Sequence, residues 1–284
     1  MTAALGGTDP AALARARREI HWASQPPSGV GLTLAVPAPD GSHAALTFDP
    51  ATRRLVSSPG PSEVQASLVV DEALLTLHHG TDGGGTTFQL AGRSFQEARA
   101  WLESTLHALV HDGEPLQVRD LSGMPPSPLA TGARFRAADQ AHIELAAWLT
   151  LAEARLSLLA GAHEDAGPVL CWPHHLDIAT LRTLVPARED DEAGGVTIGA
   201  GLTLGDASHE TPYFYVTPWP YPEDPGDLPT LELGTWHTEG WVGAGLTSEA
   251  LTTHEATSMP AVLDRFLAGA MAAAEDVHRA QGLL

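Results

Sequence analysis

Two short stretches of this sequence place a histidine and a carboxylate two residues apart. One is the heptapeptide CWPHHLD at 171–177, which contains His175 and Asp177, and the other supplies His237 and Glu239. Because side chains alternate across a strand, each pair would lie on one face of a strand. If the two strands are neighbours, two imidazoles and two carboxylates converge. That set suits a divalent metal ion with open coordination positions, or a general acid/base pair.

The competing interpretation is structural, with each imidazole bonded to its carboxylate as a brace at a strand end. The chain has fourteen histidines, so such spacings also arise without a function. The spacing also differs from the H-E-x-x-H pattern of zinc proteases. Both interpretations stay open here. The four-residue site requires the strands near 175 and 237 to be adjacent.

Side chains suited to a ligand pocket lie close to these pairs. In one predicted strand Tyr213, Tyr215 and Trp219 would share a face, and His174 and Trp236 directly precede the two histidines. Aromatic rings with polar tips provide both apolar area and hydrogen bonds, so these five residues form the candidate ligand-binding set. An ordinary core between a sheet and a helix would use them almost as well.

One predicted strand, 196–204, alternates apolar residues with glycine and threonine. One of its faces therefore carries almost no side chains and admits something close to the backbone. A ligand would fit there. The sequence favours a closely packed helix instead, and the alanine-rich segment 136–160 is the expected one.

Composition excludes several classes of function. The formal charge of −20, with arginine as the only strongly basic residue type, argues against a nucleic-acid surface. Without lysine there is no phosphate-loop lysine, and no G-x-G-x-x-G motif follows a strand, so no nucleotide cofactor is expected. No apolar run is long enough for a membrane span. A single cysteine and the absence of a signal peptide at the start indicate a cytoplasmic location.

The order of predicted elements is similar in the two halves of the chain. Helices are predicted near 10–23, 95–109, 136–160 and 258–277, and strands at 30–36, 44–48, 66–78, 86–90, 169–178, 196–204, 212–219 and 232–246. Each half therefore contains a helix, about four strands and a helix, and the Pro/Gly-rich segment 122–135 separates them.

This order predicts an α+β fold made of two similar α-β-β-β-β-α halves, with antiparallel sheets flanked by helices. The expected N-terminal half, 1–121, has plainly apolar strands and is mainly structural. The expected C-terminal half, 136–284, carries the candidate site.

Several of these motifs resemble those of a family of uncharacterised bacterial proteins with no assigned activity. The resemblance rests on residues 172–179, 201–206, 212–220 and 236–241, and on shorter matches at 18–22 and 124–125. The family usually has phenylalanine where this chain has Leu176. Because the matches cover most of the chain, the resemblance implies one functional unit, and it implies nothing about a reaction.

Two functions are therefore expected. The first is a metal-dependent enzyme in which one divalent ion, held by His175, Asp177, His237 and Glu239, acts on a small polar molecule. The second is a non-catalytic module for small-molecule binding or assembly, in which the histidine-carboxylate pairs are structural. The oligomeric state is left open by the sequence.

Overall fold

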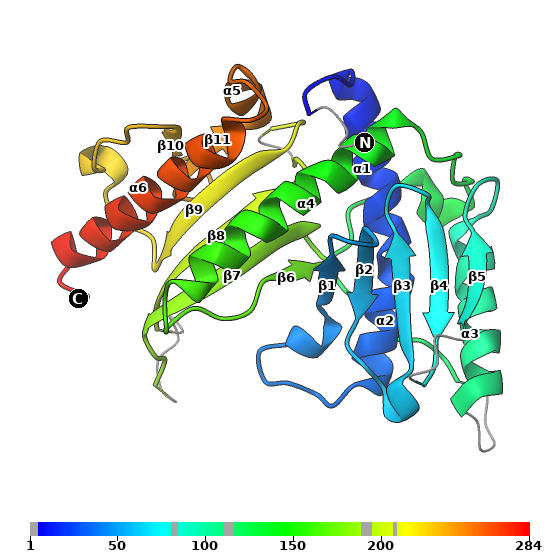
Figure 1. Cartoon of the computed structure of the whole chain (residues 1–284). Coiled ribbons are helices and arrows are strands. Elements are labelled where there is room, and N and C mark those ends of the chain that lie inside the picture. The colour runs from blue at the N-terminus through cyan, green and yellow to red at the C-terminus, as the bar shows by residue number, and fades with distance from the viewer. Residues whose placement is uncertain (1–4, 81–84, 111–115, 189–194, 207–208) are drawn as a thin grey trace. The chain divides into compact units, whose positions relative to one another are not determined.

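The computed structural model describes the whole chain except residues 1–4, 81–84, 111–115, 189–194 and 207–208. The protein is α+β, with a large antiparallel sheet and several helices (Figure 1). Beyond its first seven residues the chain forms two compact units. The first unit comprises Thr8–Thr150 and Leu170–Leu176, and the second comprises Leu151–Val169 and Asp177–Leu284.

The first unit contains an antiparallel sheet in which most strands pair with their neighbours in sequence. Its strands are β1 (Leu46–Asp49), β2 (Arg54–Ser57), β3 (Gln65–Val69), β4 (Leu74–His78), β5 (Gly85–Gln89) and β6 (Leu170–Trp172). Their order is β6-β1-β2-β3-β4-β5, so only β6 joins from a distant part of the chain. The segment 66–78, predicted as one bent strand or two, is two strands, β3 and β4, and β2 was not predicted.

The helices of the first unit pack against this sheet and around it. They are α1 (Pro10–Ala23), α2 (Gln25–Leu34), α3 (Phe95–Val110) and the first part of α4 (Gln140–Gly161). Val30 of α2 belongs to one buried cluster with Leu77 of β4 and Leu102 and Leu106 of α3. Helices α2 and α3 therefore cover the same face of the sheet (Figure 1). Ser94 and Glu97 form a capping box at the start of α3, because each side chain accepts a hydrogen bond from the other residue's backbone N–H.

The prediction of a strand at 30–36 is wrong, because helix α2 continues to Leu34. Pro26 and Pro27 do not simply end α1; they lie in the first turn of α2, where a missing N–H is harmless. The glycines of this segment also disfavour a helix when the sequence alone is considered. A Cβ at Gly29 would collide with the backbone oxygen of Arg119, and one at Gly31 with that of His43. These glycines let the helix pack closely against neighbouring backbone, at the expense of helix propensity.

The second unit contains five further antiparallel strands, which we call the second sheet. Its strands are β7 (Asp177–Val185), β8 (Val196–Thr203), β9 (Tyr213–Trp219), β10 (Thr235–His237) and β11 (Gly243–Thr247), in the order β7-β8-β9-β11-β10. The single strand predicted at 232–246 is two short strands. The end of α4, α5 (Ser248–Thr252) and α6 (Met259–Ala280) complete the unit. Short 3-10 helices in the connections of the two units span Ser42–Ala44, Pro61–Glu63, Pro128–Thr131 and Pro225–Asp227.

Helix α6 covers one face of the second sheet and contacts β8, β9 and β11 (Figure 1). Its buried side chains recur at helical spacing, and Phe266, Leu267 and Ala270 are examples. Gly199 of β8 pairs with Thr217 of β9, on the sheet face opposite to the buried Ala200 and Val216.

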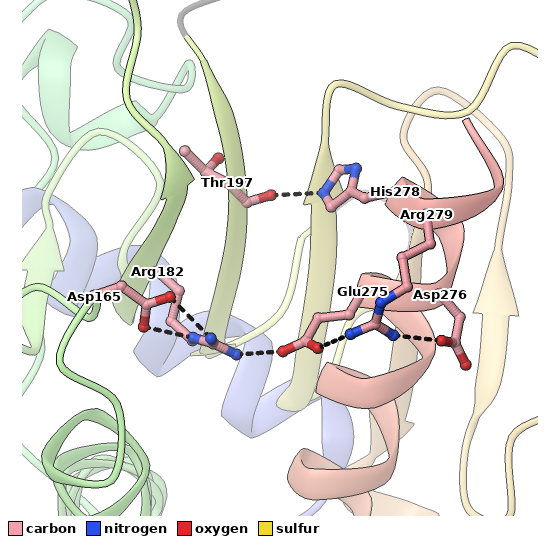
Figure 2. Close-up of polar contacts among 7 residues, drawn as sticks. All are labelled: Asp165, Arg182, Thr197, Glu275, Asp276, His278 and Arg279. Carbon is pink, nitrogen blue, oxygen red and sulfur yellow. Dashed lines mark hydrogen bonds and ion pairs between the residues drawn. The ribbon is translucent and has the colours of Figure 1, made fainter. Parts of the chain in front are cut away.

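A chain of charged groups ties β7 to α6 in the second unit, as Figure 2 shows. Arg182 of β7 bonds both carboxylate oxygens of Asp165 at 2.8 Å and Glu275 of α6 at 2.8 Å. Glu275 and Asp276 in turn bond Arg279 at 2.7 and 2.6 Å. The Arg182 side chain is only 10 % exposed, so these bonds satisfy a largely buried guanidinium.

Among the residues that the structure describes, no helix combines the length and the apolar character needed to cross a membrane.

Candidate functional site

The segment predicted as one strand over 171–178 is interrupted by a turn, so that prediction is wrong. Strand β6 ends at Trp172, β7 starts at Asp177, and the amides of His175 and Leu176 both donate to the Trp172 carbonyl, at 3.1 and 2.8 Å. Leu176 has a φ of 56°, which side chains rarely tolerate. His174 and His175 are both exposed on this turn, so strand alternation does not pair His175 with Asp177.

The turn is held by two buried polar side chains of the first unit. The Nε2 atoms of His21 and Gln25 lie 2.7 and 3.2 Å from the Pro173 carbonyl oxygen. Burial lowers the pKa of His21 to about 4, so its imidazole is neutral and Nε2–H is the donor. Gln25 also donates to the His21 carbonyl at 3.0 Å. Two helical side chains thus hold one carbonyl of the turn that contains the strained Leu176.

Beside this turn the first unit has a cavity of about 310 Å³ and another of about 470 Å³. The larger, which we call the His174 cavity, has Trp172, His174, Asp40 and Arg119 among its lining residues. The His174 and His175 rings lie 4.2 Å apart between centroids. Partial burial, and then the neighbouring His175, lower the pKa of His174, so His174 is neutral at pH 7. The cavity thus combines an uncharged imidazole with groups of both charges.

In the second unit, the two tyrosines of the candidate ligand-binding set form hydrogen bonds to aspartates. The hydroxyl of Tyr215 donates to Asp177 at 2.5 Å, and that of Tyr213 donates to Asp206 at 2.6 Å. Burial, followed by the hydrogen bond to Asp206, raises the pKa of Tyr213 well above its usual value. The partner of Asp177 in this geometry is therefore a phenol, whereas the sequence suggested an imidazole.

The small-residue face of β8 is covered in part by side chains of β9. A Cβ at Gly201 would collide with the phenol ring of Tyr215, and one at Gly199 would press on Thr217. The expectation that a helix over 136–160 packs on these glycines is wrong at Gly201. In β11, Gly243 likewise leaves room for the indole of Trp241.

The second histidine-carboxylate pair also differs from the prediction. The His237 ring stacks on Trp241 at 4.5 Å, and its Nε2 lies 2.7 Å from the backbone oxygen of Glu239, a residue beyond the end of β10. Trp236 donates its Nε1–H to the Pro229 carbonyl at 2.6 Å. Trp219 is 41 % exposed at the end of β9 and contacts Tyr221 edge to face.

The strands that carry Asp177 and His237 are not neighbours, so the expected convergence is wrong. In the second unit β7 and β10 stand first and last in the strand order, four steps apart. At about 4.8 Å per step, their backbones are about 19 Å apart, beyond the reach of two side chains to one ion. Among the described residues, no group of three or more His, Cys, Asp or Glu is placed to hold a metal ion.

The sequence reasoning missed the side chains that hold the turn and the cavities next to it. His21 and Gln25 lie about 150 positions from Pro173, and no local pattern links the two segments. The available signal was the resemblance at 18–22, which contains His21 and was left without a role. Comparisons with family models, with curated proteins and with solved structures found no match for this chain.

Proposed function

We propose that this protein binds a small polar molecule in the His174 cavity. The observation that carries the proposal is the fixed turn, in which buried His21 and Gln25 hold the Pro173 carbonyl and leave His174 at the cavity wall. A strained turn held by buried polar groups costs stability, and such strain concentrates at functional positions. An ordinary connection between two strands would need neither the strain nor the buried donors.

The lining indicates what kind of ligand fits. Trp172 offers an indole, neutral His174 offers a donor and an acceptor, and Asp40 and Arg119 supply one negative and one positive charge. A second carboxylate of the lining, Asp120, is already paired with Arg99. Hydrogen bonds from Ser42 hold the pKa of Asp40 below its usual value, so it stays ionised. A volume of about 470 Å³ is within the range of small-molecule sites. A zwitterion with a short apolar part would match these groups.

The first experiment is a thermal-shift screen with amino acids, small carboxylic acids and small amines. We expect at least one zwitterion to raise the Tm of the wild type, and that shift to be lost in His174→Ala because the imidazole contact is gone. His79→Ala, which removes an exposed histidine of the same unit, is the matched control and should keep the shift. The proposal would be contradicted if the His174→Ala variant bound the same compound as tightly as the wild type does.

The enzyme hypothesis can be tested on the same hits. A neutral imidazole is the state that a general base requires, and His174 is in that state. Binding alone is the function we propose. If NMR showed that the wild type converts a bound compound and that His174→Ala does not, the proposed function would extend from binding to catalysis.

A divalent metal ion stays a prediction, with a smaller ligand set than the four residues first named. It is tested by plasma mass spectrometry of protein purified without a histidine tag or added metal. Near-stoichiometric metal that is lost in His175→Ala or His237→Ala would support it. The prediction of a metal site would be contradicted if the protein remained metal-free after incubation with zinc, iron, manganese and nickel.

We further infer that the two units arose by duplication. Each has a helix, mostly consecutive antiparallel strands and a final helix: α2, β1–β5 and α3 in the first unit, and the end of α4, β7–β11 and α6 in the second. The domain boundaries at 122–135 stay a prediction. A cytoplasmic location also stays a proposal, supported by the single cysteine of the sequence, which allows no disulfide framework within the chain.

A further inference from the structure

A network of hydrogen bonds runs across the face of the first sheet that α2 and α3 do not cover. Leu77 of β4 faces those helices, so its neighbours Thr76 and His78 point to the other side of the sheet. Ser67 of β3 pairs with Thr76 and shares that face. Arg54 of β2 completes the set, which we call the Arg54 network. The described lining of the His174 cavity contains none of its members.

The network has a buried part and an accessible part. The hydroxyl oxygens of Ser67 and Thr76 lie 2.6 Å apart, and Thr76 Oγ1 lies 2.9 Å from His78 Nε2. Nη1 of Arg54 lies 3.0 Å from the same nitrogen of His78. Ser67 and Thr76 are each only 1 % exposed, whereas Arg54 and His78 are half-buried. Arg54 and His78 are therefore the residues that a ligand can reach.

The partners of His78 determine which of its nitrogens carries the proton. A guanidinium only donates hydrogen bonds, so Nε2 is the acceptor and the proton is on Nδ1. Burial, and then the charge of Arg54, lower the pKa of His78, in agreement with a neutral ring at pH 7. Nδ1 makes no hydrogen bond in the described part of the chain and is not enclosed. A Cβ at Gly85 would stand 2.5 Å from Nδ1, so the glycine helps to keep this donor open.

The guanidinium of Arg54 forms no ion pair with a carboxylate among the described residues. Asp49 lies opposite Arg54 in the strand register, but its carboxylate accepts from the Ala51 amide at 2.9 Å and from the Thr52 hydroxyl at 2.5 Å. The bond from Thr52 lowers the pKa of Asp49 most, and the charge of Arg54 lowers it least. Of the guanidinium nitrogens, Nε is enclosed and Nη1 is bonded to His78, which leaves the two N–H groups of Nη2 open to solvent.

We propose that the Arg54 network binds a small oxyanion, a carboxylate or a phosphoryl group, at the Arg54 guanidinium. Guanidinium N–H groups match the oxygens of such anions, and these charge-assisted bonds are stronger than bonds between neutral groups. His78 is the positioning residue, because its Nε2 holds Nη1 in place. The accessible polar atoms of Arg54 and His78 are donors only, so the pair offers nothing to a cation. The formal charge of −20 repels anions from much of the remaining surface, so binding here is local.

The test titrates the full-length protein with inorganic phosphate and, separately, with acetate, and follows its ¹H–¹⁵N NMR spectrum. Sodium chloride at the same ionic strength is the reference. The Nε–H group of Arg54 is enclosed, which slows its exchange with water, so it serves as the reporter and is assigned by its loss in Arg54→Gln. We expect at least one of the two anions to shift this signal, with a Kd of about 1 to 10 mM. A response to phosphate alone would narrow the ligand to phosphoryl compounds.

Variants at neighbouring positions separate a specific site from a general charge effect. Arg54→Gln removes the cation, so the affinity, followed by backbone amide signals of β4, should fall about tenfold or more. Arg53→Gln is the matched control, because it removes the same charge one position away, where the guanidinium is paired with Asp71. Its affinity should stay within about twofold of the wild-type value.

The positioning role of His78 has its own pair of variants. His78→Phe removes the acceptor that holds Nη1, so we expect the affinity to fall by about threefold to tenfold. In His78→Gln the amide oxygen can accept from Nη1 in place of Nε2, so this variant should recover most of the loss. A purely structural role would not distinguish the two variants in this direction once both are shown to be folded by their amide spectra.

Three results would overturn the proposal. The first is a reporter signal that moves no further in either anion, at about ten times the expected Kd, than it does in chloride. The second is equal affinity in wild type and Arg54→Gln, and the third is an equal loss of affinity in Arg53→Gln and Arg54→Gln. His174→Ala should bind both anions as the wild type does, so failure here leaves the His174 cavity untouched.

Discussion

Replacing Arg182 by methionine is expected to lower the free energy of unfolding by about 2 to 3 kcal/mol. The guanidinium is largely buried and bonds Asp165 and Glu275, whose side chains are 29 % and 25 % exposed. Methionine would keep most of the volume but leave Asp165 without its guanidinium partner and Glu275 with Arg279 alone. Chemical denaturation at pH 7, monitored by circular dichroism, measures the loss.

Arg279→Met is the matched control for Arg182→Met. Arg279 belongs to the same chain of charges in Figure 2, but its side chain is 54 % exposed. An exposed ion pair contributes little, so we expect this variant to lose less than about 1 kcal/mol. If the two variants lost equal free energy of unfolding, the burial of Arg182 would not be the reason that this network stabilises the protein.

The pH dependence of the Arg182 variant provides a second check on the same prediction. Hydrogen bonds from Arg182 hold the pKa of Asp165 below its usual value. Such a group stabilises the fold above its unfolded pKa, and that stabilisation is lost as pH falls through the folded pKa. The difference between wild type and Arg182→Met should therefore shrink below about pH 4.

Much of the fold could be predicted from the sequence because the periodicity of most elements is local. Helix α6 carries apolar residues at helical spacing, and β3, β4, β8 and β9 lie where strand patterns predicted them. Helix α2 could not be predicted in this way. Its two prolines and two glycines are poor helix formers, and its conformation depends on close packing against backbone far away in sequence.

The site was predicted less well than the fold, since it depends on which strands are neighbours. The spacing of His175 with Asp177 assumed a regular strand, and a turn with Leu176 at positive φ replaces it. His237 does contact Glu239, but its Nε2 bonds the backbone oxygen of Glu239 and not the carboxylate. Sequence patterns report which residues share a strand face. They do not report strand order, which places β7 and β10 apart.

Protonation of His21 should destabilise the protein as the solution is acidified. Burial lowers the pKa of His21 to about 4, against 6.5 for the unfolded chain. Between these values the unfolded state binds more protons, so the free energy of unfolding falls as pH falls through this window. The full difference is about 3 kcal/mol, and it is lost by about pH 4. The quantity to measure is the unfolding free energy of wild type minus that of His21→Gln, at about pH 7.5, 5.5 and 4.

His142→Gln gives a control of opposite sign. His142 is 2 % exposed; burial lowers its pKa, but hydrogen bonds to Glu19 and Asp139 outweigh burial and raise it overall. A raised pKa stabilises the fold below the unfolded value of 6.5, and that contribution is lost as pH rises through the folded pKa. Wild type minus His142→Gln should therefore increase on acidification, while wild type minus His21→Gln decreases. If both differences changed in the same direction, neutral His21 would not be the group that holds the Pro173 turn, and the proposal for the His174 cavity would lose its main support.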